Sequence, residues 1–507
     1  MSNRRLLFYN DSRHYYLYCY DPPISLADVR APVDELLGTR VDTLVYGSGP
    51  GATVFHNTRV GEIWGERFDG FDTMYAYRAA ENIRSLIERG LDPLDALIDR
   101  AHEKDMEFFA SLRMANPGPP DADSVFNSKF NLDHPEWCLR TRSSSNFNYV
   151  HPEVRAERFA LAEEYVSRYD VDGLELDWVF EPVFFEEGEV EENTPLMTGF
   201  VREIRQAVDK AAGEQGRPIL LGARVLPTRD GNLAAGLDVP TWIHEGLLDF
   251  VVPNFYGCQD LDADFPFEWL VQLARETECK VYPALQARIQ GDDPALHGHD
   301  YSLGTYMAEK EHYYAGAATY WDKGADGIYL PWFRYPNGAN HQILSEIHDP
   351  DTLREKPKHY VVRCHNDAAA AQGYDSPLPL SLVTGSEVLG QTVQLYIADD
   401  AERAHACLKL RLADWSPADS MTVSLNGQSL PGPSRRQRYG YRYDWLEFDL
   451  SSGTLQRGLH EVVGTDGKDF HTCLFRNSFN FFTPFRSHQR IPACIFIVQN
   501  EFNAIQS

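Results

Sequence analysis

The sequence predicts an α/β protein in which a (β/α)8 TIM barrel is followed by a C-terminal all-β sandwich domain. Two observations predict the barrel. Eight short apolar segments recur over the first two thirds of the chain, and amphipathic segments of helical length lie between most of them. A third observation predicts the sandwich, because the apolar segments after Pro357 are short, often alternate with polar residues and are separated by turn signals.

The eight apolar segments are near-continuous hydrophobic runs, which is typical of parallel strands buried on both faces. We expect barrel strands at Leu6–Asn10, Thr43–Gly47, Glu107–Arg113, Gly173–Trp178, Ile219–Val225, Phe250–Tyr256, Lys280–Gln286 and Gly327–Trp332. The helical patterns cover Tyr77–Arg89, Pro93–Lys104, Val154–Tyr169, Leu196–Ala212, Pro240–Gly246, Phe267–Thr277 and Tyr306–Lys323. A doubly wound open sheet is the alternative, but no Gly-rich phosphate loop follows the first strand, so the barrel is favoured.

The C-terminal third shows the pattern of an antiparallel β domain. The turn signals include Asn426-Gly427 and Pro431-Gly432. The expected strands are Tyr360–Cys364, Gln391–Ile397, Leu408–Leu412, Met421–Leu425 and Leu446–Leu450. We therefore expect a catalytic barrel over residues 1–355 and a sandwich over 358–468. For residues 469–507 two alternatives stay open, an irregular tail or extra strands.

Composition limits the function classes. The chain has 507 residues, with 47 Lys and Arg against 75 Asp and Glu and a net charge of −28. Such an acidic chain does not favour nucleic-acid binding or an anionic membrane surface. The N-terminal residues contain no apolar run of export-signal length, and the eight cysteines form no C-x-x-C pair. We therefore expect a cytoplasmic protein with free thiols, no metal site and no cofactor; a homo-oligomer stays open.

The segment Tyr169–Trp178 (YDVDGLELDW) carries the strongest chemical signal. Because side chains alternate along a strand, Glu175 and Asp177 share one face, and the leucines and Trp178 share the other. The apolar face fits the helix layer, so both carboxylates point into the barrel. Asp177 ends the strand, at the mouth where barrel enzymes carry their active sites. The alternative is a buried ion pair that only stabilises the barrel.

Two segments together resemble a known family. They are NYVHPEVR at 148–155 and RYDVDGLELD at 168–177, and they resemble the glycosyl-hydrolase-like family 10 proteins, most strongly over residues 108–185. The resemblance implies a (β/α)8 barrel related to glycosidases. The strand is also similar to the D-G-x-D-x-D-x-E signature of family 18 chitinases, but Val179 stands where that signature has its terminal acid.

Glycoside hydrolysis needs two carboxyl groups, about 5–5.5 Å apart for retention and about 6.5–9.5 Å apart for inversion. Asp177 is the first candidate, with Glu175 beside it as a further catalytic residue. Glu181 is the leading partner for Asp177. Further alternatives for this second acid are Asp11, Asp230 and Asp260. The seventh strand ends at Gln286, without the acid that many retaining barrel glycosidases carry there.

Arginine, amide and aromatic residues at strand ends complete the expected site. Two readings of the arginines stay open: they pair with Glu175 and Asp177 and lower their pKa values, or they bind an anionic sugar substituent. Aromatic rings suit the apolar faces of sugars. The expected substrate-binding residues are Arg113, Asn116, Trp178, Arg224, Asn254, Tyr256, Gln286, Trp332 and Arg334.

These observations predict a glycoside hydrolase that acts on an oligosaccharide or polysaccharide fragment, with exo action in a closed pocket. The expected partner is therefore a carbohydrate. Two alternatives stay open. One is a non-catalytic carbohydrate-binding barrel that lacks a second acid, and the other is a hydrolase or lyase for an acidic (uronate or sulfated) sugar held by arginines.

Overall fold

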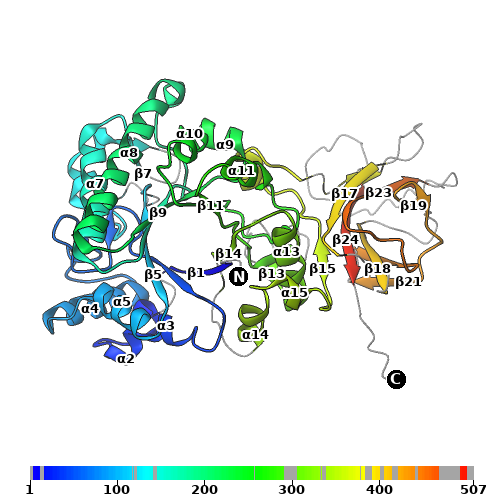
Figure 1. Cartoon of the computed structure of the whole chain (residues 1–507), viewed down its shortest axis with the longest axis horizontal. Coiled ribbons are helices and arrows are strands. Elements are labelled where there is room, and N and C mark those ends of the chain that lie inside the picture. Colours follow the sequence, from blue (N-terminus) through cyan, green and yellow to red (C-terminus); the bar gives the residue numbers. More distant parts are fainter. Residues whose placement is uncertain are drawn as a thin grey trace, which may run out of the picture.

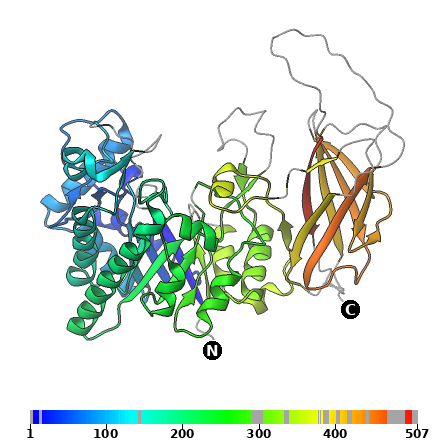
Figure 2. The same cartoon turned by 90° about the horizontal axis from the view of Figure 1, so that it is seen from above.

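A computed structural model shows the arrangement of the chain (Figure 1). It describes residues 4–11, 16–116, 118, 121, 123–140, 145–255, 257–290, 305–331, 333, 339–376, 378, 380–382, 391–399, 405–413, 421–439, 443–466 and 491–499. Two parts lie side by side along the long axis, a barrel with its helices and a C-terminal β domain (Figure 2). None of the described helices combines the length and the apolar character needed to cross a bilayer.

The first part is an eight-stranded parallel barrel whose strands neighbour one another in chain order. The strands are β1 (Arg5–Asp11), β2 (Thr43–Gly47), β5 (Glu107–Arg113), β8 (Gly173–Asp177), β9 (Leu220–Val225), β10 (Phe250–Pro253), β11 (Lys280–Val281) and β14 (Gly327–Leu330). The ring is nearly closed, because β1 pairs with β14 and the Leu285 amide donates to the Tyr329 carbonyl at 2.8 Å. This confirms the predicted barrel and all eight of its strands.

Helices cover the outside of the barrel (Figure 1). The longer ones are α4 (Met74–Glu88), α5 (Pro93–Glu103), α7 (Pro152–Arg168), α8 (Val190–Gln215), α13 (Lys310–Asp322) and α14 (Ala339–Glu346). Shorter ones are α1 (Tyr16–Cys19), α2 (Leu26–Val29), α3 (Ala31–Asp34), α6 (Lys129–Asp133), α9 (Arg229–Ala234), α10 (Val239–His244), α11 (Glu268–Ala274), α15 (Pro350–Leu353) and α16 (Asp367–Ala371). Helix α8 begins earlier than predicted, with acidic residues in its first turn, where they interact favourably with the helix dipole.

Short strand pairs in the loops, one parallel and two antiparallel, extend three of the strand ends. They are β3 (Thr53–Val54) with β4 (Glu62–Ile63), β6 (Cys138–Arg140) with β7 (Ser145–Phe147), and β12 (Arg288–Gln290) with β13 (Thr305–Met307). The first and second follow β2 and β5, and the third follows β11, so all three lie at the carboxyl ends of barrel strands. They therefore build up the face on which barrel enzymes carry their sites.

Large apolar and aromatic side chains fill the lower barrel interior, towards the amino ends of the strands. Buried members include Leu7, Phe109, Phe250 and Tyr282. Glycines on the inward face make room for the rings: a Cβ on Gly222 would lie 2.1 Å from the ring of Phe250. The barrel centre is therefore a packed core at this end.

The C-terminal part consists of two antiparallel sheets with an apolar core between them. One sheet contains β15 (His359–Val361), β16 (Leu380–Leu382), β18 (Ala406–Ala413), β21 (Arg435–Tyr439), β22 (Tyr443–Leu450) and β24 (Ile491–Gln499). The other contains β17 (Gln391–Ile397), β19 (Met421–Leu425), β20 (Gln428–Ser429) and β23 (Gly458–Asp466). Leucines on alternate positions of β18 pack against Val423 and Leu425 of β19. This confirms the predicted C-terminal β domain.

Two local features of this domain bear on the sequence analysis. The predicted turn at Asn426-Gly427 joins β19 to β20, and both residues have positive φ, 51° and 75°. Strand β24 lies between β15 and β18, so part of the segment for which a tail or extra strands were expected is an inner strand of this sheet.

Candidate functional site

The upper barrel interior, at the carboxyl ends of the strands, is polar and charged. The sheet register places Ser111, Glu175 and Gly222 at one level of neighbouring strands. One level higher it places Arg113, Asp177 and Arg224 side by side. The structure thus brings Glu175 and Asp177, which strand parity predicted to point inward, together with the expected site residues Arg113 and Arg224.

Glu175 is fully buried and one of its oxygens accepts three hydrogen bonds. Its Oε1 accepts from Arg224 Nη2 at 2.6 Å, from Ser111 Oγ at 2.7 Å and from the Tyr329 hydroxyl at 3.2 Å. Its Oε2 has no hydrogen-bond partner in the described part of the chain. These contacts fix the side chain, so Glu175 is placed to orient Arg224.

Burial decides the protonation behaviour of this cluster. It raises the pKa of Glu175; Arg224 opposes this effect and Asp177 adds to it. Arg224 pairs with Glu175 and acts to lower its pKa, as one of the two open readings stated, but removing the carboxylate from water outweighs the ion pair and the net direction is upward. Burial alone would lower the pKa of Arg224, but Asp177 and Glu175 hold it well above its usual value.

Asp177 ends β8 directly above Glu175. Its Oδ1 accepts from the Val179 amide at 3.2 Å, which fixes the carboxylate plane. Its Oδ2 lies 3.4 Å from Arg224 Nη1 and has no hydrogen-bond partner among the described residues. Asp177 is thus a buried carboxylate with one oxygen held only by a long ion pair.

Arg113 and Asp11 form the second charged pair of this end. Arg113 Nη2 lies 3.9 Å from Asp11 Oδ2, and its Nη1 donates to the Pro50 carbonyl at 3.3 Å. The guanidinium carbon lies 3.5 Å from the centre of the Phe180 ring. The barrel mouth therefore contains Asp11, one of the alternative acids, on the opposite side of Arg113 from Asp177.

Two tyrosines belong to the cluster and were missed in the sequence analysis. The Arg224 guanidinium lies 4.0 Å from the ring centre of Tyr9 and 5.0 Å from that of Tyr329. Burial raises the pKa of Tyr9 to about 12, so its hydroxyl keeps its proton. Both tyrosines lie on predicted strands with inward parity, and this parity is the signal that could have found them.

The expected amide residues lie near the same end. Gln286 Nε2 donates to Asn254 Oδ1 at 2.5 Å, and both side chains are buried. Asn116 is also buried and donates to Asn127 Oδ1 at 3.1 Å. Asn254 and Gln286 thus form one polar pair where the seventh strand lacks an acid.

Trp178 was expected to bind substrate, and the structure corrects this expectation. The indole is 0% exposed and packs against Tyr149, Phe184 and Trp242 in the helix layer. Because side chains alternate along the strand, Trp178 points away from the barrel interior, opposite to Asp177. Trp178 therefore stabilises the contact between the sheet and the helices.

The other alternative acids occupy different surroundings. Glu181 is half-buried on the loop after β8, where its φ of 46° is unusual for a residue with a side chain. Its carbonyl accepts from Asn146 Nδ2 at 3.0 Å. Asp230 is exposed in the first turn of α9, whereas Asp260 is buried and accepts from Asn366 at 3.1 Å. Asp230 has the surroundings of a solvated surface acid.

Three of the expected substrate-binding residues, Tyr256, Trp332 and Arg334, lie outside the described residues.

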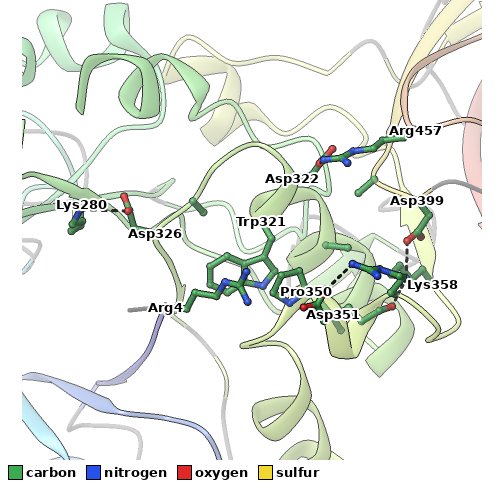
Figure 3. Close-up of a pocket in the computed structure, with 15 residues that line it drawn as sticks. Arg4, Lys280, Trp321, Asp322, Asp326, Pro350, Asp351, Lys358, Asp399 and Arg457 are labelled. Carbon is green, nitrogen blue, oxygen red and sulfur yellow. Dashed lines mark hydrogen bonds and ion pairs between the residues drawn. The ribbon is translucent and has the colours of Figure 1, made fainter. Parts of the chain in front are cut away.

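A cavity of about 640 Å³ lies at the opposite end of the barrel, against the β domain (Figure 3). Arg4 precedes β1 and Lys280 begins β11, so this cavity borders the amino ends of the strands. Its basic residues are paired with acids: Lys358 with Asp399 at 3.0 Å and Arg457 with Asp322, for example. The Arg4 guanidinium carbon lies 5.7 Å from the centre of the Trp321 ring, and the two side chains overlap in Figure 3. Of these pairs, Arg457 with Asp322 joins the β domain to helix α13 of the barrel part.

A comparison with protein-family models gives a match that includes strand β8, which carries Glu175 and Asp177. Residues 54–193 match the model of the glycosyl hydrolase-like 10 family. The match confirms the predicted resemblance, and it contains β5, α7 and β8 with Glu175 and Asp177. No curated protein matches this chain.

Solved structures similar to the chain include three glycosidases. The α-L-fucosidase isoenzyme 2 of Paenibacillus thiaminolyticus is 13% identical, with a TM-score of 0.41; the match covers 72% of this chain and 53% of the fucosidase. The PgaB (BpsB) glycoside hydrolase domain of Bordetella bronchiseptica is 14% identical, with a TM-score of 0.42 and coverage of 68% and 99%. A GH27 β-L-arabinopyranosidase of Geobacillus stearothermophilus is 11% identical, with a TM-score of 0.38 and coverage of 94% and 98%. The chain thus spans about half the length of the fucosidase.

Proposed function

We propose that the protein is a glycoside hydrolase in which Asp177 is a catalytic carboxylate. The observation that carries the proposal is the position of Asp177 at the carboxyl end of a barrel strand, with Oδ2 free of hydrogen bonds among the described residues. Glu175 fixes Arg224 from below, and Arg224 in turn aligns the carboxylate of Asp177. A carboxylate held in this way serves as nucleophile or general base, or donates a proton as general acid.

Glu181 is the proposed second acid, and Asp11 is its rival. A left-handed backbone at a residue other than glycine costs free energy and persists where the surroundings fix it. Here the Glu181 carbonyl accepts from Asn146 and from the Val183 amide, at 3.0 and 2.7 Å. Asp11 lies across Arg113 within the barrel mouth. Glu181→Gln and Asp11→Asn, compared in the same assay, distinguish the two, since only the true partner lowers hydrolysis to the level of the Asp177 variant.

The charges of the site favour a neutral sugar. Three described carboxylates, those of Asp11, Glu175 and Asp177, face the two guanidinium groups of Arg113 and Arg224. Both arginines thus already have acidic partners, which supports a neutral oligosaccharide over a uronate or a sulfated sugar. A non-catalytic carbohydrate-binding barrel is the remaining alternative, and turnover distinguishes it.

The test of the proposal is hydrolysis of labelled oligosaccharides by the full chain and by Asp177→Asn. We expect the variant to lose activity by about 10²–10⁴-fold, the usual contribution of one acid–base group. Asp170→Asn is the matched control, because Asp170 precedes the amino end of β8, away from Asp177, and 64% of its side chain is exposed. Undiminished hydrolysis by Asp177→Asn contradicts the role of Asp177, and binding without turnover in the wild type contradicts hydrolase activity.

A further inference from the structure

A second cavity lies where the barrel meets the β domain, and we call it the junction cavity. Its volume is about 400 Å³, within the size range of small-molecule sites, and such sites favour domain interfaces. The barrel loop after β10 supplies Asp262 and Asp264, the connecting segment supplies Arg363 and Tyr374, and β17 supplies Thr392 and Gln394. β15 and β17 lie on the side of the β domain that faces the barrel (Figure 1).

The deep wall of the junction cavity is fixed before any ligand binds. Arg363 is only 4% exposed and donates to the Cys364 and Tyr374 carbonyls at 3.2 and 3.4 Å. Its Nε lies 3.6 Å from Asp262 Oδ2 and has no hydrogen-bond partner in the described structure. The Tyr374 hydroxyl donates to the same Asp262 oxygen at 3.1 Å. A buried, charged side chain held by Asp262 and two carbonyl groups therefore lines the cavity.

The lining combines apolar and hydroxyl-binding groups. Val361, Val362 and Leu395 provide apolar surface, while Thr392 and Gln394 of β17 provide polar groups. Sugars present apolar C–H faces and a ring of hydroxyls, and they need both kinds of partner. Thr392 and Gln394 are exposed on β17, so their side chains are accessible at the cavity rim.

The charges of the cavity favour a neutral ligand over an anionic one. Asp262, Asp264 and Asp375 line it against the single guanidinium of Arg363. Burial raises the pKa of Asp264 to about 6, although Lys323 beside it opposes this effect. Carboxylates accept hydrogen bonds from hydroxyls and repel uronate or sulfate groups, so the lining suits a neutral saccharide.

The junction cavity is connected to the barrel mouth by direct packing. Phe255 directly follows Asn254 of the mouth, and its ring stacks on Tyr374 with centroids 5.5 Å apart. The loop after β10 leaves the carboxyl end of the barrel, which is also the end that carries Asp177. Both sites therefore belong to the same end of the barrel.

We propose that the junction cavity binds a neutral saccharide, as an accessory subsite for a chain whose other end enters the barrel mouth. Binding at the cavity rests on its own lining, and only the link to cleavage rests on the proposed function. The β domain then contributes directly to substrate binding through β17.

The test is calorimetric titration of the full chain, in the Asp177→Asn background, with six-unit neutral malto-, cello-, xylo- and β-1,3-gluco-oligosaccharides. We expect one of these oligosaccharides to bind. The double variant Thr392→Val with Gln394→Ala, at two exposed positions, should raise its Kd about tenfold because two hydrogen bonds are lost. Gln428→Ala, an exposed glutamine on β20, is the control and should leave Kd unchanged. Circular dichroism verifies that the variants fold alike.

Three results would overturn the inference: no binding of any neutral oligosaccharide, an unchanged Kd in the double variant, or tighter binding of hexagalacturonate than of every neutral chain. The outcome is distinguishable from failure of the proposed function. If saccharide binding depends on β17 but the wild type hydrolyses nothing, the subsite stands and the hydrolase proposal fails. If hydrolysis depends on Asp177 but the double variant binds normally, the hydrolase proposal stands and the subsite proposal fails.

Discussion

The two ends of the barrel interior are built from opposite kinds of side chain. Towards the amino ends of the strands, rings such as Phe109 and Phe250 stack with centroids 5.4 Å apart. Towards the carboxyl ends, Glu175, Asp177 and Arg224 are equally buried but ionisable. Close packing of apolar side chains stabilises a barrel by itself. Buried charges are tolerated only when each charge keeps its partner of opposite sign, because an unpaired buried charge is costly. Burying such a set is costly for the fold, and this cost is one reason for proposing that the upper end serves function.

The largest expected effect comes from removing the shared cation. Arg224→Met leaves Glu175 and Asp177 buried without their guanidinium, so we expect the barrel to lose about 3–5 kcal/mol of unfolding free energy. Urea unfolding followed by tryptophan fluorescence measures this loss. Adding Glu175→Gln to the variant removes one uncompensated charge and should restore part of the stability.

The matched control is an exposed ion pair of the same length. Arg202 Nη2 lies 2.6 Å from Glu245 Oε2, as Arg224 Nη2 does from Glu175 Oε1, but both side chains of this pair are more than 40% exposed. Arg202→Met should therefore cost less than about 1 kcal/mol. Equal losses in the two variants would show that burial does not distinguish the two pairs.

A smaller effect is expected from a carboxylate at the amino end, Asp42. Burial raises its pKa from 3.8 to about 6, against hydrogen bonds from the Leu6 amide at 3.0 Å and Thr43 Oγ1 at 2.7 Å. Between about pH 4 and 6 the folded chain keeps a proton that the unfolded chain releases, so the unfolding free energy falls as pH rises, by up to about 3 kcal/mol. Asp42→Asn cannot ionise and avoids this fall.

The measurement is the stability difference between Asp42→Asn and wild type at pH 4 and at pH 7. We expect this difference to shift in favour of the variant by up to about 3 kcal/mol at the higher pH. Other carboxylates contribute equally to both proteins and cancel. The same difference at both pH values would show that Asp42 ionises normally in the folded barrel.

Local sequence patterns predicted much of the barrel and half of its charged cluster. Continuous apolar runs located all eight strands, because strands buried on both faces leave that pattern. Alternation within one strand then predicted that Glu175 and Asp177 face inward. It also predicted that Trp178 faces the helices, and the expectation that Trp178 binds substrate failed because it ignored this alternation.

Contacts between distant strands could not be predicted in the same way. The bond from the Tyr329 hydroxyl to Glu175 depends on how the closed barrel aligns eight strands, which no single segment encodes. The place of β24 between β15 and β18 is likewise a pairing over a long stretch of chain. The sign of the pKa shift of Glu175 needed the degree of burial, and the sequence does not contain that quantity.

The smallest expected effect tests the boundary between the two ends. Gly222 lies between Glu175 and Phe250 in the register, and a Cβ there would lie 2.1 Å from the Phe250 ring. Gly222→Ala should therefore cost about 1–3 kcal/mol by overpacking, measured as a lower urea midpoint. Gly213→Ala in α8 is the control: its Cβ meets nothing within 4 Å, so this helical position should gain about 0.5–1 kcal/mol. If Gly222→Ala is as stable as wild type, the Phe250 ring can move, and the aromatic layer does not support the charged cluster above it.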